Sequence, residues 1–126
     1  MEAMILAAGR GERLRPLTDS IPKPLITVGG LTLIEHHLFK LSSFGFKHVV
    51  INVSYLGEKI MSFLGDGTRF DLKISYSIES DGALGTAGGI LNALEYFLED
   101  QFLVFLGHAA ADHNPQIRSL ELQRPQ

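Results

Sequence analysis

Glycines and arginines cluster directly after the first apolar run of the sequence, residues 3–7. Gly9 and Gly11 permit a positive φ and let a ligand approach the main chain closely. Exposed N–H groups in such a turn form an anion-binding concavity. The loop also holds arginines whose charge suits phosphate oxygens: Arg10, Arg13 and Arg15. This spacing predicts a phosphate-binding loop, because a plain surface turn would not need so many cations after a buried strand.

Two familiar phosphate loops do not fit this segment. A Walker A loop ends in Gly-Lys-Ser or Gly-Lys-Thr, which this stretch lacks. The dinucleotide-binding fingerprint needs a third glycine where Leu14 stands, and an acidic residue about twenty positions later, where Gly29 and Gly30 stand. Pro16 and Pro22 also interrupt the chain where a helix would follow. An NAD(P)-binding domain is therefore disfavoured.

The loop and the segment after it resemble the signature of the sugar-1-phosphate nucleotidyltransferases. Two stretches carry the resemblance, LAAGRGERLRPLT at residues 6–18 and PKPL at residues 22–25. The positions that match the signature are Ala7, Ala8, Gly9, Gly11, Arg13 and Lys23. Glu12 stands where the family often carries Ser or Thr. A glutamate there resembles the branch of N-acetylmuramate 1-phosphate uridylyltransferases and mannose 1-phosphate guanylyltransferase-like proteins.

The resemblance implies that the chain joins a nucleoside triphosphate to a sugar 1-phosphate. The sugar phosphate would attack the α-phosphorus and pyrophosphate would leave, so positioning and charge stabilisation would dominate catalysis. Arg13 would hold the departing phosphates, and Lys23 would neutralise charge between the α-phosphate and the sugar phosphate. The nucleotide-binding residues implied in this loop are Leu6, Ala7, Ala8, Gly9, Arg10, Gly11 and Glu12. The branch resemblance favours UTP, with GTP and mannose 1-phosphate as the alternative substrate pair.

A second glycine-rich stretch, ESDGALGTAGGI at residues 79–90, follows an expected strand and opens an expected helix. It resembles the base-recognition segment of the same family, which typically reads Leu-Gly-Thr-Ala-Gly before its helix. The residues that this resemblance places against the nucleotide are Glu79, Leu84, Gly85, Thr86 and Gly88. The alternative is a helix capped by Thr86, with glycines used for packing. Beside the first loop, base recognition is the better interpretation.

The apolar run at residues 102–106 is followed by Gly107 and His108. Here the family carries Gly-Asp, and the aspartate binds the Mg²⁺ that bridges the phosphates. A carboxylate is a suitable ligand for Mg²⁺, whereas imidazole suits softer transition metals. Asp112 aligns with a second acidic residue common just downstream. The implied cofactor is therefore Mg²⁺, and its candidate ligands in this chain are His108 and Asp112.

Three other histidines indicate no metal site. His36 and His37 are adjacent on an expected helix, so their side chains point in different directions and do not chelate one metal. His48 begins an expected strand, and we interpret it as an ordinary surface residue.

Short apolar runs alternate with segments of helical periodicity along the chain. The expected strands cover residues 3–7, 48–53, 72–78 and 102–106, with a short extended piece at 25–28. The expected helices cover residues 32–44, 56–64 and 86–98, the last with Ile90, Leu91, Leu94 and Leu98 on one face. Beyond Gly107 only residues 117–122 suggest a turn or two of helix. This order predicts an α/β protein with a Rossmann-like, mostly parallel sheet and helices on both faces.

The composition excludes several classes of partner and chemistry. The net charge of the 126 residues is −3, which does not suggest a nucleic-acid surface or a polybasic membrane patch. No apolar run has the length of a membrane span, and the first residues lack the features of a signal peptide. Without cysteine the chain has no disulfides or thiol chemistry. We therefore expect a cytoplasmic protein with no nucleic-acid or membrane partner.

The resemblance covers residues 1–107, the N-terminal nucleotide-binding part of a nucleotidyltransferase domain, and leaves 108–126 as a divergent tail. Catalytic domains of the family continue much further, which predicts a truncated version of that fold. Two hypotheses follow: an enzyme that makes a nucleotide-activated sugar, or a non-catalytic remnant that still binds nucleotide phosphates. The strand at 102–106 would become an exposed apolar edge, which predicts self-association, most simply as a homodimer.

Overall fold

The computed structural model describes residues 1–9, 16, 19–80, 82 and 84–105, and the backbone of 120–123. The strands are β1 (Glu2–Leu6), β2 (Thr27–Val28), β3 (Leu31–Thr32), β4 (His48–Val53), β5 (Lys73–Ile78), β6 (Gln101–Phe105) and β7 (Leu120–Gln123). The α-helices are α1 (Leu33–Ser43), α2 (Gly57–Leu64) and α3 (Gly85–Ala93), and the 3₁₀ turns are η3 (Lys23–Leu25), η4 (Thr68–Phe70) and η5 (Leu94–Tyr96). The main strands and helices up to β6 lie where the sequence predicts them.

Five strands form one sheet in the order β5-β4-β1-β6-β7. β1 lies between β4 and β6 and is parallel to both, and β5 continues the parallel arrangement beside β4. β4 reads HVVINV and is buried along its whole length. Continuous burial is typical of parallel strands that are covered on both faces. The prediction of an α/β fold with a Rossmann-like, mostly parallel sheet is confirmed.

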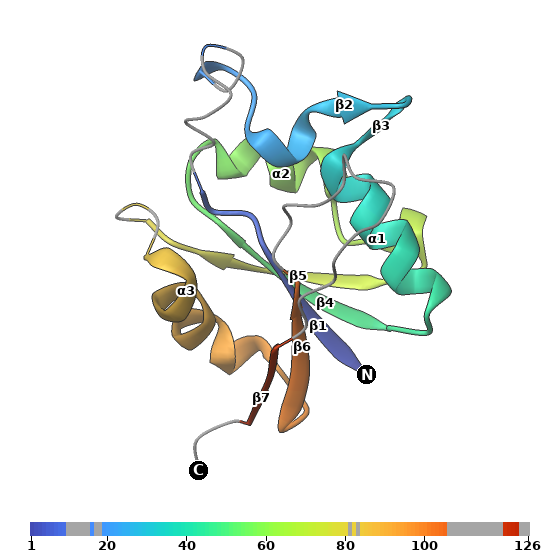
Figure 1. Ribbon diagram of the computed structural model, residues 1–126, viewed down its shortest axis with the longest axis vertical. Helices are drawn as coiled ribbons and strands as arrows, with labels where there is room; N and C mark the ends of the chain where they lie inside the picture. The colour runs from blue at the N-terminus through green and yellow to red at the C-terminus, as the bar shows by residue number, and fades with distance from the viewer. Residues whose placement is uncertain (10–15, 17–18, 81, 83, 106–119, 124–126) are drawn as a thin grey trace.

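Helices cover both faces of this sheet (Figure 1). α1 and α2 pack on one face, where Leu38, Leu41 and Ile60 join the larger core cluster. α3 packs on the other face, where Ile90 and Ala93 join a second cluster. Because both faces are occupied, the carboxyl ends of the parallel strands are the place where such a sheet binds a ligand.

α1 begins with a complete capping box. The Glu35 N–H donates to the Thr32 hydroxyl at 3.2 Å, and the Thr32 N–H donates to Glu35 Oε1 at 2.9 Å. Arg69, from η4, donates to Glu35 Oε2 at 2.6 Å. Burial alone would raise the pKa of Glu35, but the hydrogen bonds from Thr32 and Arg69 outweigh it and lower the pKa. The start of α1 is therefore fixed both to its own first turn and to η4.

Replacing Thr32 with alanine is expected to lower the free energy of unfolding by about 1 kcal/mol, because the Glu35 N–H loses its acceptor. Thr32→Ser keeps the hydroxyl and is the matched control, with an expected change within about 0.5 kcal/mol. Urea unfolding followed by far-UV circular dichroism measures both variants. Equal losses in the two variants would contradict the capping role.

The last described strand differs from the prediction. The sequence predicts a turn or two of helix at residues 117–122, but Leu120–Gln123 forms β7, antiparallel to β6. The prediction was wrong because β7 is stabilised by the backbone N–H and C=O groups of β6, and a local pattern does not show such a partner. β6 is therefore not an open edge, which removes the reason given for self-association.

α3 is shorter than predicted and ends at Ala93, where η5 continues the chain. The change of helical pitch directs Phe97 into the core and leaves Leu98 80% exposed. Leu91 is 65% exposed, since it lies about 100° around the helix from its buried neighbour Ile90. The predicted apolar face was therefore wrong at Leu91 and Leu98.

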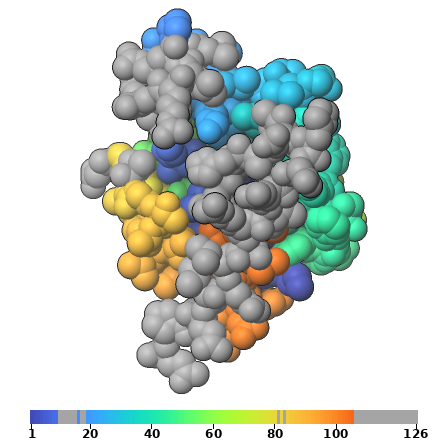
Figure 2. Space-filling model, in the orientation of Figure 1, coloured from blue at the N-terminus to red at the C-terminus, as the bar shows by residue number. Residues whose placement is uncertain are grey.

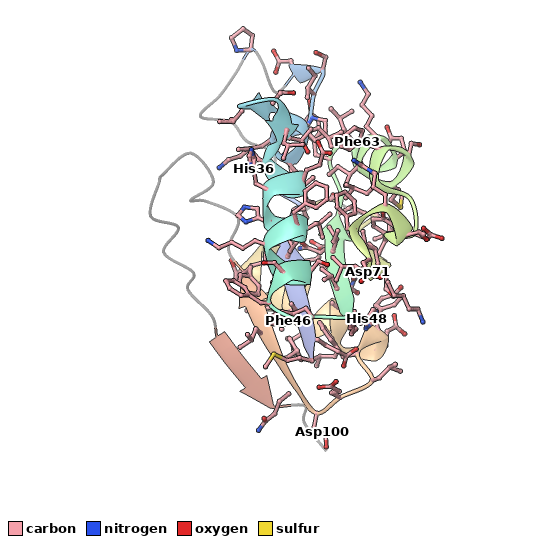
Figure 3. The ribbon with its side chains drawn as sticks, turned by 90° about the vertical axis from the view of Figure 1, so that its right-hand side faces the viewer. His36, Phe46, His48, Phe63, Asp71 and Asp100 are labelled. Atoms are coloured by element: carbon pink, nitrogen blue, oxygen red, sulfur yellow. The ribbon has the colours of Figure 1, made fainter. Side chains whose placement is uncertain are left out.

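His48 is buried, so its interpretation as a surface residue was wrong. Its Nδ1 is hydrogen-bonded to the Glu2 carboxylate, and its Nε2 lies 2.8 Å from Ser75 Oγ. Glu2 also accepts hydrogen bonds from the N–H groups of Leu98 and Glu99, at 2.9 and 2.6 Å. Figure 3 shows His48 at the lower end of the sheet, away from the β2–β3 hairpin. These contacts join the amino ends of β1, β4 and β5 to the segment before β6.

Candidate functional site

Three neighbouring parallel strands end at the same rim of the sheet. Ala7 follows β1, Asn52 lies near the end of β4, and Glu79 follows β5. The strand register aligns Leu6 with Asn52 and Val53 with Ile78, so these ends are level. This rim brings the two glycine-rich stretches of the sequence together, since one follows β1 and the other follows β5.

Buried polar groups connect the two stretches. The Ala7 N–H donates to Asn52 Oδ1 at 2.6 Å, and Asn52 Nδ2 donates to Glu79 Oε2 at 2.8 Å. Glu79 Oε1 accepts a hydrogen bond from the Leu84 N–H at 2.8 Å. Asn52 and Glu79 are only 2% and 3% exposed. Glu79, predicted to lie against the base, therefore has each carboxylate oxygen hydrogen-bonded within the protein.

The backbone above these groups is open. Gly9 is exposed, and a Cβ added there would have no atom within 4 Å. Gly85 has a φ of +76° and is equally open, and its neighbours Leu84 and Thr86 are exposed. Leu6 is half-buried, and Ala7 and Ala8 lie just beneath the surface at 4% exposure. A ligand therefore has access to the main chain at Gly9 in the first stretch and at residues 84–86 in the second.

Thr86 does not cap α3, so that alternative was wrong. Leu84 is the N-cap residue, and its apolar side chain has no acceptor that could make a capping bond, while its backbone N–H donates to Glu79. The packing role of glycines is confirmed at two positions. A Cβ on Gly88 would lie 2.9 Å from Leu84 Cβ, and a Cβ on Gly89 would lie 2.8 Å from Nδ2 of the buried Asn52 side chain. Small residues are thus required where α3 begins.

Lys23 is the first residue of η3, and Pro22, with a φ of −65°, is its N-cap residue. Its side chain is half-buried, and within the described part of the chain its ammonium group makes no ion pair. The preceding segment is anchored to the start of α2, because Tyr55 and Lys59 donate hydrogen bonds to backbone carbonyls of residues 19 and 20. The β2–β3 hairpin lies toward the upper end of the molecule, and α3 lies lower, on the left of the sheet (Figures 1 and 2).

Six predicted site residues lie outside the described residues: Arg10, Gly11, Glu12, Arg13, His108 and Asp112. Their roles stay predictions from the sequence. Over residues 1–9, 19–80 and 84–105, no three His, Asp or Glu side chains gather in a group that could hold a metal ion. In the same part of the chain, no helix has the length and apolar character needed to cross a membrane.

The sequence interpretation missed Asn52. It treats HVVINV as an apolar strand and assigns the asparagine no role. The signal was present, because an amide inside an otherwise buried apolar strand must find hydrogen-bond partners. Its partners are 45 and 27 residues away in the sequence, so only the fold identifies them.

The chain matches the family described as nucleotidyl transferase over residues 2–118. It is 52% identical over 112 residues to an N-acetylmuramate alpha-1-phosphate uridylyltransferase from Neisseria meningitidis serogroup B, covering 89% of this chain and 48% of that protein. It is 38% identical over 107 residues to a mannose-1-phosphate guanylyltransferase from Mycobacterium tuberculosis, covering 85% of this chain and 30% of that protein.

A solved structure has a similar fold. HddC from Yersinia pseudotuberculosis, complexed with GMP-PN, matches with a TM-score of 0.74 and 28% sequence identity. The match covers 84% of this chain and 47% of HddC. The chain thus spans about half the length, or less, of these relatives.

Proposed function

Because this chain belongs to the nucleotidyl transferase family, we propose that it binds a nucleoside triphosphate along the rim formed by residues 6–9 and 84–88. UTP is the favoured nucleotide, since the relative with 52% identity is a uridylyltransferase. GTP is second, since a guanylyltransferase matches at 38%. The substrates of the proposed transfer are therefore UTP and a sugar 1-phosphate, with GTP and mannose 1-phosphate as the alternative pair.

One observation carries this site: two stretches from distant parts of the sequence meet at one rim, and each is open at a glycine. Residues 7–9 and 84–86 are linked through buried hydrogen bonds, and both Gly9 and Gly85 have free space above them. Exposed main-chain N–H groups bind phosphate oxygens and base edges alike. The first segment suits the phosphates, and the second suits the base.

In the proposed reaction, an oxygen of the sugar phosphate attacks the α-phosphorus of the nucleotide. The bond from that phosphorus to the oxygen of the β-phosphate breaks, and pyrophosphate leaves with the electron pair. Lys23 would neutralise the two phosphates that approach one another, and Arg13 would hold the leaving pyrophosphate. Lys23 suits this role because its ammonium group has no carboxylate partner in the described residues.

The family resemblance also implies Mg²⁺, which would neutralise phosphate charge when bound. Of the two candidate ligands, Asp112 has the oxygen donor that Mg²⁺ prefers, whereas the imidazole of His108 does not fit it. The residues present therefore fit the ion only in part, and no step of the proposed reaction is assigned to it.

Lys23→Ala is expected to weaken UTP binding about 10- to 100-fold, since a charged hydrogen bond to phosphate contributes about 1.5–3 kcal/mol. Isothermal titration calorimetry with UTP and GTP, with and without Mg²⁺, measures this change. Lys73→Ala is the matched control, because Lys73 is an exposed lysine at the first residue of β5, the end opposite the rim. Arg13→Ala tests the other predicted cation in the same titration.

The outcomes separate the two hypotheses for this chain. Turnover of UTP and a sugar 1-phosphate to pyrophosphate would establish an enzyme. Binding that depends on Lys23 and Arg13 without turnover would establish a nucleotide-binding protein that does not catalyse the transfer. If neither nucleotide binds, the proposed site is wrong.

A further inference from the structure

Asn52 is the central member of the buried hydrogen-bond network at the rim. Its Oδ1 accepts from the Ala7 N–H at 2.6 Å, and its Nδ2 donates to Glu79 Oε2 at 2.8 Å. The other oxygen of Glu79 accepts from the Leu84 N–H at 2.8 Å. The network thus runs from the end of β1, through β4 and the end of β5, to the N-cap of α3. Only three hydrogen bonds separate the two open segments of the proposed site.

The polarity of this network is fixed at each position. The Ala7 N–H needs an acceptor, so Asn52 presents its oxygen to Ala7 and its NH₂ group to Glu79. The Glu79 carboxylate is an acceptor on both oxygens, so it can satisfy the Asn52 amide and the Leu84 N–H together. An isosteric exchange at either side chain therefore breaks a bond without changing the shape.

The surroundings leave these two side chains no alternative position. Glu79 is held through its backbone, because its N–H donates to the Val53 carbonyl at 2.8 Å and its carbonyl accepts from Ser54 Oγ at 2.9 Å. A Cβ added to Gly89 would lie 2.8 Å from Asn52 Nδ2 and 3.2 Å from Glu79 Oε2. The amide and the carboxylate are therefore enclosed by β4, β5 and α3.

We infer that Asn52 is a positioning residue that sets the base-binding segment at residues 84–86 relative to the phosphate-binding segment at residues 7–9. This inference rests on the proposed function and adds to it a residue that need not touch the nucleotide. The bond from the Ala7 N–H to Asn52 does not depend on Glu79. The bond from Asn52 to Glu79 therefore determines where the Leu84 segment lies relative to Ala7. Loss of that bond should weaken recognition of the base while leaving the phosphate segment in place.

The two single exchanges break the bond in different ways. In Asn52→Asp, a carboxylate oxygen replaces Nδ2 and meets a Glu79 oxygen, so two acceptors face each other. In Glu79→Gln, the side chain keeps one acceptor oxygen, which serves either Asn52 or the Leu84 N–H but not both. The double variant Asn52→Asp/Glu79→Gln restores all three hydrogen bonds. Only the bond between positions 52 and 79 changes direction, because the amide introduced at position 79 donates to the carboxylate introduced at position 52.

The experiment measures the dissociation constants of UTP and of inorganic tripolyphosphate by calorimetry for the wild type and three variants. Each single variant is expected to bind UTP about 10-fold more weakly, the equivalent of one net hydrogen bond. Tripolyphosphate affinity is expected to stay within about 3-fold, since this ligand has no base. The double variant is expected to recover UTP binding to within about 3-fold of the wild type. Asn92→Asp is the matched control, because Asn92 of α3 donates to Ser77 Oγ and has no part in the network.

The double variant keeps the test decisive even if Asn52→Asp alone does not fold. Wild-type affinity for UTP in both single variants, or a double variant as weak as the sum of the singles, would overturn the positioning role. Equal loss of UTP and tripolyphosphate would also overturn it, because a general loss of structure affects both ligands. If the wild type binds UTP no more tightly than tripolyphosphate, the base contributes nothing and the inference fails. If the wild type binds neither ligand, the proposed function itself fails.

Discussion

Replacing Gly67 with alanine is expected to lower the free energy of unfolding by about 3 kcal/mol, the sum of backbone strain and steric overlap. Gly67 has a φ of +94°, which L side chains rarely adopt. A Cβ there would lie 2.5 Å from the Leu72 carbonyl oxygen and 2.7 Å from Ile74 Cγ1. The Gly67 carbonyl also accepts from the N–H groups of Phe70 and Leu72, so the backbone cannot move away without losing hydrogen bonds. Urea unfolding followed by far-UV circular dichroism measures the change.

Gly45 provides the matched control for this prediction. Its φ is +90°, nearly the same as that of Gly67, but a Cβ added there would meet no atom within 4 Å. Gly45→Ala therefore introduces the backbone strain without the overlap, at an expected cost of about 1 kcal/mol. If the two variants lose the same stability, the contacts of the added methyl group with Leu72 and Ile74 do not matter, and the steric argument is wrong.

The turn that contains Gly67 illustrates what the sequence can predict. The residues GDGT indicate a turn after a helix, and the structure has one there, between α2 and η4. β4 has the predicted bounds because a run of β-branched residues marks a buried strand with no competing helical pattern. Local patterns were sufficient wherever the determining contacts are close in sequence.

Contacts between distant residues were not predictable in the same way. The burial of His48 depends on Glu2, 46 residues earlier, and on Ser75, 27 residues later. The start of α3 is held by Glu79 instead of by the hydroxyl of Thr86, because the fold brings a buried carboxylate to the Leu84 N–H. β7 exists through its pairing with β6. In each case the missing information was the identity of a partner, which hydrophobic periodicity does not contain.

The candidate site divides in the same manner. The glycine-rich stretches and Lys23 could be found from the sequence, because the family signature is a local pattern. Asn52 could not be given a role, because its function depends on joining two strands to a helix. Arg13 lies outside the described residues, so its role as a phosphate ligand stays a prediction.

Replacing Glu2 with alanine is expected to lower the free energy of unfolding by about 3 kcal/mol, because its buried carboxylate accepts several hydrogen bonds and an unpaired donor costs about 1–3 kcal/mol. Glu2 is 2% exposed, and its carboxylate accepts from the backbone N–H groups of Leu98 and Glu99 and is bonded to His48. Alanine leaves the buried His48 side chain and the part-buried N–H groups of Leu98 and Glu99 without that partner. Urea unfolding measures the loss. Glu95→Gln, at an exposed glutamate of η5, is the control and should change stability by less than about 0.5 kcal/mol.

The same carboxylate makes the effect depend on pH in a known direction. Burial alone would raise the pKa of Glu2, but the hydrogen bonds from His48, Glu99 and Leu98 outweigh it and lower the pKa below its ordinary value of 4.5. A carboxyl whose folded pKa is depressed stabilises the fold above its unfolded pKa, and this contribution is lost as the pH falls through the folded pKa. Glu2→Gln keeps the size of the side chain and removes its titration. The stability difference between the wild type and Glu2→Gln should therefore shrink as the solution is acidified below 4.5. A difference that stays constant through that range would show that the charge of Glu2 does not stabilise the fold, and the packing of its side chain would then have to account for the loss in Glu2→Ala.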